Sequence, residues 1–314
     1  MKHLNTYITE YIVKKKLDKF VDSEDHYKYF PKTKKELIEN IKELIDNKIY
    51  DSNCIDTREI TDMSQLFKEV NINKIKDTID ISKWNVSNVK DMSYMFFGCE
   101  LFDCNLSGWN VSNVVSMISM FFNCQNFKGK GLENWNVSKV TTMKYMFYKC
   151  ENFDCNLSNW NIRNVENMSE MFNNCYKFAG KGLENWNINK VENMSYMFNN
   201  CLNFDCDLSN WDVINVEDMS HMFYKCEKFD CDLSKWNVSN VTNMAGVFEG
   251  CKKFTGKGLE NWNVSNVKYI KFMFSDCINF NCDLSNWNVS NVEYMIFAFY
   301  NCTSLKNTPS WYKE

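Results

Sequence analysis

The sequence of 314 residues contains few of the residues on which several classes of enzyme depend. Its only histidines are His3, His26 and His221, and none of them lies in an H-E-x-x-H zinc motif. It has no G-x-x-x-x-G-K-[ST] phosphate loop, no G-x-G-x-x-G dinucleotide fingerprint and no G-x-S-x-G nucleophile elbow. We therefore predict a protein without catalytic residues, cofactor or bound metal.

Charge and hydropathy exclude further classes of protein. The formal net charge of −4 gives no bulk attraction to nucleic acid or to anionic lipid. No apolar run reaches the roughly 18 residues that a membrane span needs. The N-terminal segment MKHLNTYITEYIVKKKLDKF has neither the apolar region nor the cleavage site of a signal peptide. The residues themselves thus predict a cytoplasmic location, without nucleic-acid binding or membrane insertion.

The tryptophans, in contrast, recur along the chain at a nearly constant spacing. They are Trp84, Trp109, Trp135, Trp160, Trp186, Trp211, Trp236, Trp262, Trp287 and Trp311, with successive gaps of 24 to 26 residues. A fixed period of this length is typical of a solenoid, in which each repeat forms one coil stacked on the last. We number each repeat from its tryptophan, which is position 0.

Two apolar spacings occur within each repeat. Around position 0, the pattern Trp-x-Val alternates and predicts a short strand. From position +5 the steps are three and four, as in Val165, Met168, Met171, Phe172 and Cys175. That spacing predicts a short helix, and Asn189 with Glu192 or Ser290 with Glu293 would cap it. The predicted fold is an α/β solenoid of about ten coils with short parallel strands and short helices.

The string Leu132-x-x-Trp135-x-Val137-x-x-Val140 is a variant of the leucine-rich repeat frame. The repeats resemble the BspA-like leucine-rich repeats of bacterial surface proteins. The phrases that carry the resemblance are LSKWNVSNVTNMAGVF at 233–248 and LSGWNVSNVVSMISMF at 106–121, and the resemblance covers about residues 55–311. It implies a surface or secreted binding protein, with adhesion as its function, and it supplies no catalytic residues.

The two ends of the chain depart from the repeat. Residues 1–50 do not repeat, and we predict a helical N-terminal region that caps the solenoid of residues 51–314. Apolar residues between Leu4 and Ile12 have helical spacing, and Thr33-Lys-Lys-Glu36 is a capping box before an amphipathic helix at 34–47. Terminal coils are expected at 55–80 and 303–314.

Fifteen cysteines raise the question of metal binding or disulfides. Nine of them occupy position +15, and five more follow five residues later. The resulting C-x4-C spacing differs from the C-x2-C knuckle of structural zinc sites, and no histidine recurs with it. We predict mostly buried free thiols, with disulfides and metal as the alternatives.

The Lys-Gly-Lys-Gly insertion at 128–131 indicates turn-forming glycines rather than a phosphate site.

If the tryptophans point inward, the residues directly after them point to solvent. The candidate binding face consists of Asn110, Asn136, Asn161, Asn187, Asp212, Asn237 and Asn263. This row is either a contact surface for a protein or a glycan, or a ladder of hydrogen-bonded amides that only supports the coils. The predicted function is a non-enzymatic protein-binding or adhesion module whose partner is a protein such as a host or cell-surface component. The alternative is an intracellular interaction scaffold.

Overall fold

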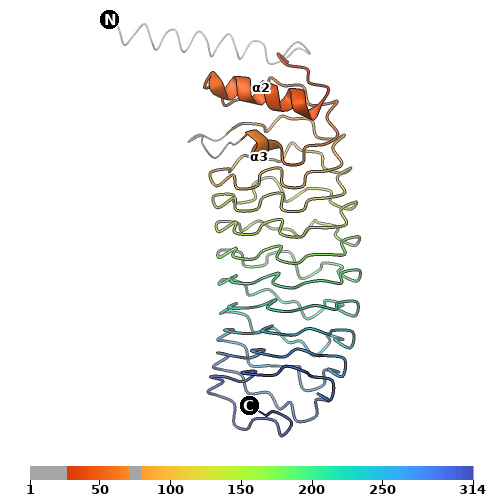
Figure 1. Ribbon diagram of the computed structural model, residues 1–314, viewed down its shortest axis with the longest axis vertical. Coiled ribbons are helices and arrows are strands. Elements are labelled where there is room, and N and C mark those ends of the chain that lie inside the picture. Colours follow the sequence, from red (N-terminus) through yellow and green to blue (C-terminus); the bar gives the residue numbers. More distant parts are fainter. Residues whose placement is uncertain (1–26, 71–78, 314) are drawn as a thin grey trace, which may run out of the picture.

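The computed structural model describes residues 27–70 and 79–313, so the helix expected near Leu4–Ile12 lies outside the described residues. Successive coils lie one above another from the N-terminal end to the C-terminus and form a single elongated stack (Figure 1). One continuous apolar core runs through the stack, from Leu37 to Phe299. The prediction of a solenoid is confirmed by this arrangement.

The described residues contain two helices, both at the N-terminal end. Helix α2 spans Lys34–Asp46 and lies over the end of the stack, and the short α3 spans Leu66–Val70 beneath it (Figure 1). Leu37, Ile41 and Leu44 of α2 are fully buried in the common core. The Thr33 hydroxyl accepts a hydrogen bond from the Glu36 N–H at 3.2 Å, as the capping box requires. The Glu36 carboxylate reaches back to the N–H of Lys32, not to that of Thr33.

The strand predicted around each tryptophan is wrong. In the described residues, parallel pairing consists of isolated bridges between successive coils, and it falls mainly at position +7. The bridges at this position run through Asp91, Ser116, Thr142, Asn167, Asn193, Asp218, Asn243, Tyr269 and Tyr294. At the tryptophan itself the chain turns, because the Trp160 N–H donates to the carbonyl of Leu157, three residues earlier, at 3.0 Å.

The short helix predicted in each coil is also wrong, because this segment is a run of β-turns. In one coil the N–H groups of Met171 and Cys175 donate to carbonyls three residues earlier, at 3.2 and 3.0 Å. Glu170 and Asn174, at positions +10 and +14, have φ angles of 58° and 61°, as expected for the third residue of a type II turn. Their own N–H groups donate to the next coil at 2.8 Å. Turns closed over three residues repeat apolar side chains at nearly the helical interval, which explains the error.

The predicted helix caps fail for the same reason. Asn189 lies inside a turn that is closed by the bond from the Val191 N–H to the Ile188 carbonyl at 2.9 Å. Ser290 lies in the equivalent turn, where the Val292 N–H donates to Val289. Neither residue begins a helix.

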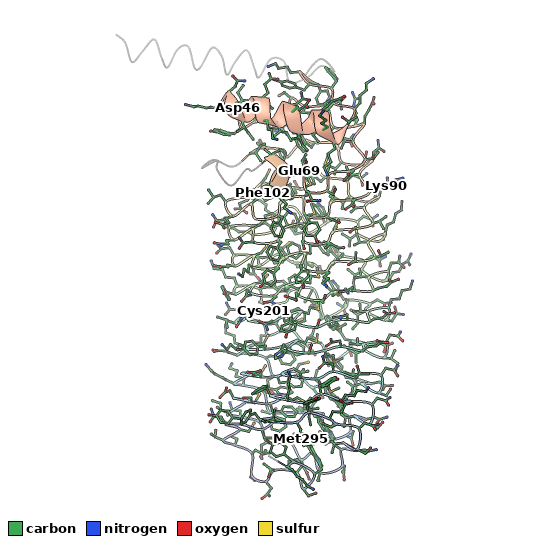
Figure 2. All side chains as sticks on the ribbon, in the orientation of Figure 1. Asp46, Glu69, Lys90, Phe102, Cys201 and Met295 are labelled. Carbon is green, nitrogen blue, oxygen red and sulfur yellow. The ribbon has the colours of Figure 1, made fainter. Side chains whose placement is uncertain are left out.

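The core is built from columns of identical residues that hydrogen-bond between coils. Each of the ten indole N–H groups donates to a backbone carbonyl of the preceding coil, as from Trp186 to Leu157 at 3.1 Å. Phenylalanines at position +12 stack coil on coil, with centroids 5.5 Å apart for Phe147 and Phe172. The Cys201 thiol, inside the stack (Figure 2), lies 3.1 Å from the Phe172 carbonyl. Tryptophan and cysteine thus satisfy backbone carbonyls while they fill space.

The glycines of the inserted loops allow neighbouring coils to approach closely. Gly129 and Gly131 have φ angles of +87° and +94°. A Cβ atom at Gly131 would lie 2.2 Å from the backbone nitrogen of Ser107. The prediction of turn-forming glycines is therefore confirmed, and close contact between coils adds a second reason for them.

Candidate functional site

All seven residues of the candidate binding face are exposed, while the tryptophan before each of them is buried. Their side-chain oxygens accept hydrogen bonds from the backbone N–H two residues later, at 3.1 Å for Asn110 and 3.4 Å for Asn161. This Asx turn fixes the carbonyl oxygen of each amide and leaves its NH₂ group pointing away. In the part of the chain that the structure describes, no bond joins one member of this row to the next.

Amide side chains do join neighbouring coils by hydrogen bonds, but these side chains stand at position +4 and not at position +1. There the amide nitrogen of Asn113 donates to the Ser87 carbonyl of the preceding coil at 2.8 Å, and Asn215 donates to Asn189 at 2.6 Å. Where lysine replaces asparagine, Lys190 donates to the side chain of Asn164 at 3.2 Å. The structural role considered for the row at +1 thus belongs to the row at +4. The sequence carried this signal, because every +4 position is Asn or Lys.

A shallow depression of about 360 Å³ lies on the candidate face between two neighbouring coils. Asn185 and Asn187 line it from one coil, and Asn210 and Asp212 line it from the next. All four side chains are exposed, and negative charge comes from Asp212 and from Glu184, which also lines the depression. Two residues of the predicted face, Asn187 and Asp212, therefore lie together in a polar hollow that offers both hydrogen-bond donors and acceptors.

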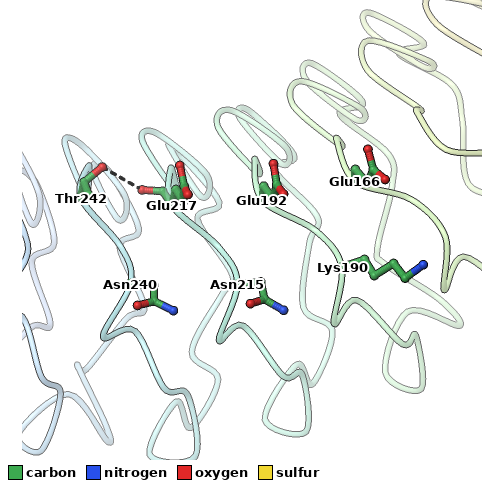
Figure 3. A pocket seen from close by; sticks show the side chains of 7 residues that line it. All are labelled: Glu166, Lys190, Glu192, Asn215, Glu217, Asn240 and Thr242. Atoms are coloured by element: carbon green, nitrogen blue, oxygen red, sulfur yellow. Dashed lines mark hydrogen bonds between the residues drawn. The ribbon is translucent and has the colours of Figure 1, made fainter.

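A second depression, of about 610 Å³, lies beside positions +4 and +6 and was missed from the sequence. Figure 3 shows Glu166, Glu192 and Glu217 side by side in a row on consecutive coils, with Asn215 and Asn240 below them. The glutamates' backbones are joined, since the Glu192 N–H donates to Glu166 at 2.9 Å and the Glu217 N–H to Glu192 at 2.8 Å. Reading the repeats by position would have revealed this row of carboxylates.

The three carboxylates of this row are not neutralised. Within residues 27–70 and 79–313 none of them accepts a hydrogen bond or pairs with a cation. Lys190 lines the same depression, but its ammonium group is bonded to Asn164. Stacked like charges repel one another, so a cationic group that bound there would relieve the repulsion.

The cysteines do not form a reactive centre. All fifteen are free thiols, and most are buried. Burial is the largest effect on their ionisation: it raises the pKa of Cys155 and of Cys206 to about 12. These thiols stay protonated near neutral pH, and a protonated thiol is a poor nucleophile and a poor metal ligand. The prediction of free, mostly buried thiols is confirmed.

The described residues contain neither a metal-binding cluster nor a membrane-spanning helix. Among the described residues, no group of three or more His, Cys, Asp or Glu side chains is arranged to hold a metal ion. None of the helices in residues 27–70 and 79–313 has the length and apolar character needed to cross a bilayer.

Comparison with known proteins gives one family and several solved structures. A leucine-rich repeat protein from Eubacterium ventriosum is 14% identical, with 74% of this chain and 86% of that chain covered and a TM-score of 0.33. One from Bacteroides ovatus is 14% identical, covering 79% and 66%, with a TM-score of 0.33. A leucine-rich cell surface protein from Faecalibacterium prausnitzii is 14% identical, covering 79% and 82%, with a TM-score of 0.29.

No curated protein matches the chain. The profile of one family, however, matches it at residues 34–154, 61–181, 149–257 and 230–313. Because these matches together extend over nearly the whole solenoid and α2, the chain belongs to the family described as Mycoplasma protein of unknown function, DUF285.

Proposed function

We propose that this chain is a non-enzymatic protein-binding module, and that its partner lies across the middle coils and presents basic side chains. The observation that carries the proposal is the row of Glu166, Glu192 and Glu217, whose carboxylates are unpaired in the described residues and line one depression. An extended partner with lysines or arginines would meet one carboxylate per coil.

The exposed amide row supports the same proposal. Asn187 and Asp212 lie in the neighbouring depression, and the row is not used to join the coils. A repeated surface spreads binding energy over several coils instead of one deep pocket.

We also propose that the function is adhesion at a surface, in line with the resemblance to BspA-like repeats. Protease treatment of intact native cells tests this, because an exposed protein is cleaved and an internal one is not.

The test of the binding surface uses cross-linking on native cells to identify the partner, followed by titration of the purified pair. Replacing Glu166, Glu192 and Glu217 with Gln keeps their shape and removes three charges. Binding should weaken by about 0.5 to 1 kcal/mol per carboxylate and lose much of its dependence on salt. Replacing Asn161, Asn187 and Asn237 with Lys should weaken it as well.

The matched control removes three charges from another column. Glu100, Glu151 and Glu227 all stand at position +16, away from both depressions. Their replacement with Gln should leave affinity unchanged. If this control weakened binding as much as the change at Glu166, Glu192 and Glu217, the proposed surface would be wrong.

A further inference from the structure

One coil has a glycine at position +10 on the turn side of the stack, where every other coil has a side chain. At positions +9 and +10 the coil of Trp236 carries Ala245 and Gly246, where the next coil carries Lys271 and Phe272. A depression of about 260 Å³ lies at this place. It is lined by Tyr196, His221, Asn243, Ala245, Tyr269 and Lys271, together with Ser220.

The position of His221 depends on Gly246. A Cβ atom at Gly246 would lie 2.3 Å from Nδ1 of His221, so any larger residue there would displace the imidazole. The ring stacks on Tyr196, with centroids 4.8 Å apart, and its Nδ1 lies 3.8 Å from the Glu249 carboxylate. Burial, helped by nearby Lys271, lowers the pKa of His221. Near neutral pH the imidazole therefore offers one donor and one acceptor.

The depression combines aromatic rings with a mixed set of polar groups. Tyr196 and Tyr269 bring rings to it from coils on either side of Ala245. The Lys271 ammonium has no hydrogen bond or ion pair within the described residues. The Asn243 oxygen is already used by the Ala245 N–H at 3.2 Å, which leaves the amide NH₂ group as a donor.

Charged groups of both signs surround the depression, with one more anion than cation near His221. Lys271 is the cation that faces His221, while Asp218 and Glu249 are the anions near it. A site of this kind has no strong preference for a charged ligand. Its mixed donors and acceptors suit hydroxyl groups, and the negative face of a tyrosine ring attracts the weakly positive C–H groups of a sugar ring. Its volume is below the range of about 300–1,000 Å³ for drug-sized ligands, which suits a single ring.

We propose that this depression binds an uncharged saccharide, as a hexose or N-acetylhexosamine unit of a glycan. The sugar ring lies over Ala245 against Tyr269, and its hydroxyl groups bond to His221, Asn243 and Lys271. None of the residues that line this depression belongs to the carboxylate row or the amide row, so the test of the saccharide site is independent of the proposed protein partner.

The test is an NMR titration of the full chain with glucose, galactose, N-acetylglucosamine and N-acetylgalactosamine. The chain has only three histidines, so the ring signals of His221 can be assigned by a His221→Gln variant. At least one sugar should shift the His221 signals in a saturable way. Ala245→Leu fills the depression and should weaken that binding about tenfold or more. Lys271→Met, at an exposed position, should weaken it without affecting folding.

The control is Ser93→Leu, which makes a comparable change at the same position +9 in a distant coil. It should leave the titration unchanged, and melting curves of all variants show whether each is folded. Absence of any saturable shift with the four sugars would overturn the proposal. It would also be overturned by a response that survives both Ala245→Leu and Lys271→Met, or by an equal loss in Ser93→Leu. A protein partner that is lost with Ala245→Leu, without any response to sugars, would assign the depression to protein binding instead.

Discussion

A central coil and the last complete coil contain the same residue types but differ in burial. In the coil of Trp160, Val165, Met168 and Cys175 are 0% exposed. Their counterparts Val292, Met295 and Cys302 in the coil of Trp287 are only partly buried. A coil does not bury its own side chains, because each residue is covered by the same residue in the coils on either side.

The backbone hydrogen bonds of the central coil and of the last coil differ in the same way. The N–H groups of Phe172 and Asn174 donate to the next coil at 2.9 and 2.8 Å. Those of Phe299 and Asn301 have no acceptor within residues 27–70 and 79–313. The C-terminal tail replaces part of the missing coil, since the Trp311 indole donates to the Leu284 carbonyl at 2.8 Å and Tyr312 packs edge-on against Phe299 at 5.1 Å. The end of the stack should therefore tolerate substitutions that the centre does not.

The largest predicted effect is unfolding at alkaline pH. Thiols in the central coils and in the last coil should contribute to it almost equally. Burial raises the thiol pKa values, to about 12 even for half-buried Cys302. A raised native pKa means that stability is complete below the unfolded value of about 9 and is lost as the pH rises toward the native value. Burial raises the pKa of all nine thiols at position +15, and each contributes at most about 1.4 kcal/mol per pH unit above about pH 9, so the free energy of unfolding should fall steeply there. Urea titrations between about pH 8 and 11 measure it.

The variants Cys175→Ala and Cys302→Ala compare the two coils directly. Each variant should reduce the fall in the free energy of unfolding per pH unit by the contribution of one thiol. The reason is that both native pKa values lie well above the unfolded one. A slope that stays the same in both variants would show that other groups control alkaline unfolding.

Truncation of tryptophan should separate the two coils clearly. Trp186→Ala removes a large side chain with a neighbour on each side, and it should lower the free energy of unfolding by about 3–5 kcal/mol. Trp311→Ala should cost only about 1–2 kcal/mol, because this side chain is partly exposed. Denaturant titration of both variants measures the difference. Equal losses at the two positions would contradict the explanation by neighbouring coils.

The smallest effect concerns the two asparagine rows. Asn164→Ala removes a bond of 2.9 Å to the Ser138 carbonyl and also the acceptor of Lys190. Asn291→Ala removes a single bond of 2.7 Å to Ser265. We expect losses of about 1–1.5 kcal/mol for the first and about 0.5–1 kcal/mol for the second. Asn161→Ala in the exposed row should stay within about 0.5 kcal/mol. Thermal melts of the three variants measure these losses. If Asn161→Ala lowered the melting temperature most, the conclusion that the row at +4 joins the coils would be wrong.

The sequence contains a signal for the turns at position +14. Gly, Asn or Asp stands at position +14 in seven of nine coils, at Gly98, Asn123, Asn174, Asn200, Gly250, Asp276 and Asn301. These residues adopt positive φ angles more readily than others, which indicates turns rather than a helix. The carboxylate row of Glu166, Glu192 and Glu217 could likewise have been found by aligning position +6. The saccharide site was harder to predict, because it depends on small residues in one coil and large residues in its neighbours.

The sequence by itself determined the period, the inward columns and the amphipathic α2, because each follows from the spacing of apolar residues along the chain. It also determined which residues flank the tryptophans and therefore face solvent. Only the tertiary structure decided that the coils are built from turns, because a helix and a run of β-turns share an interval of three to four residues. It alone decided which amide row joins the coils and which is free. Those bonds connect residues about 26 positions apart, and their geometry exists only once one coil lies on the next.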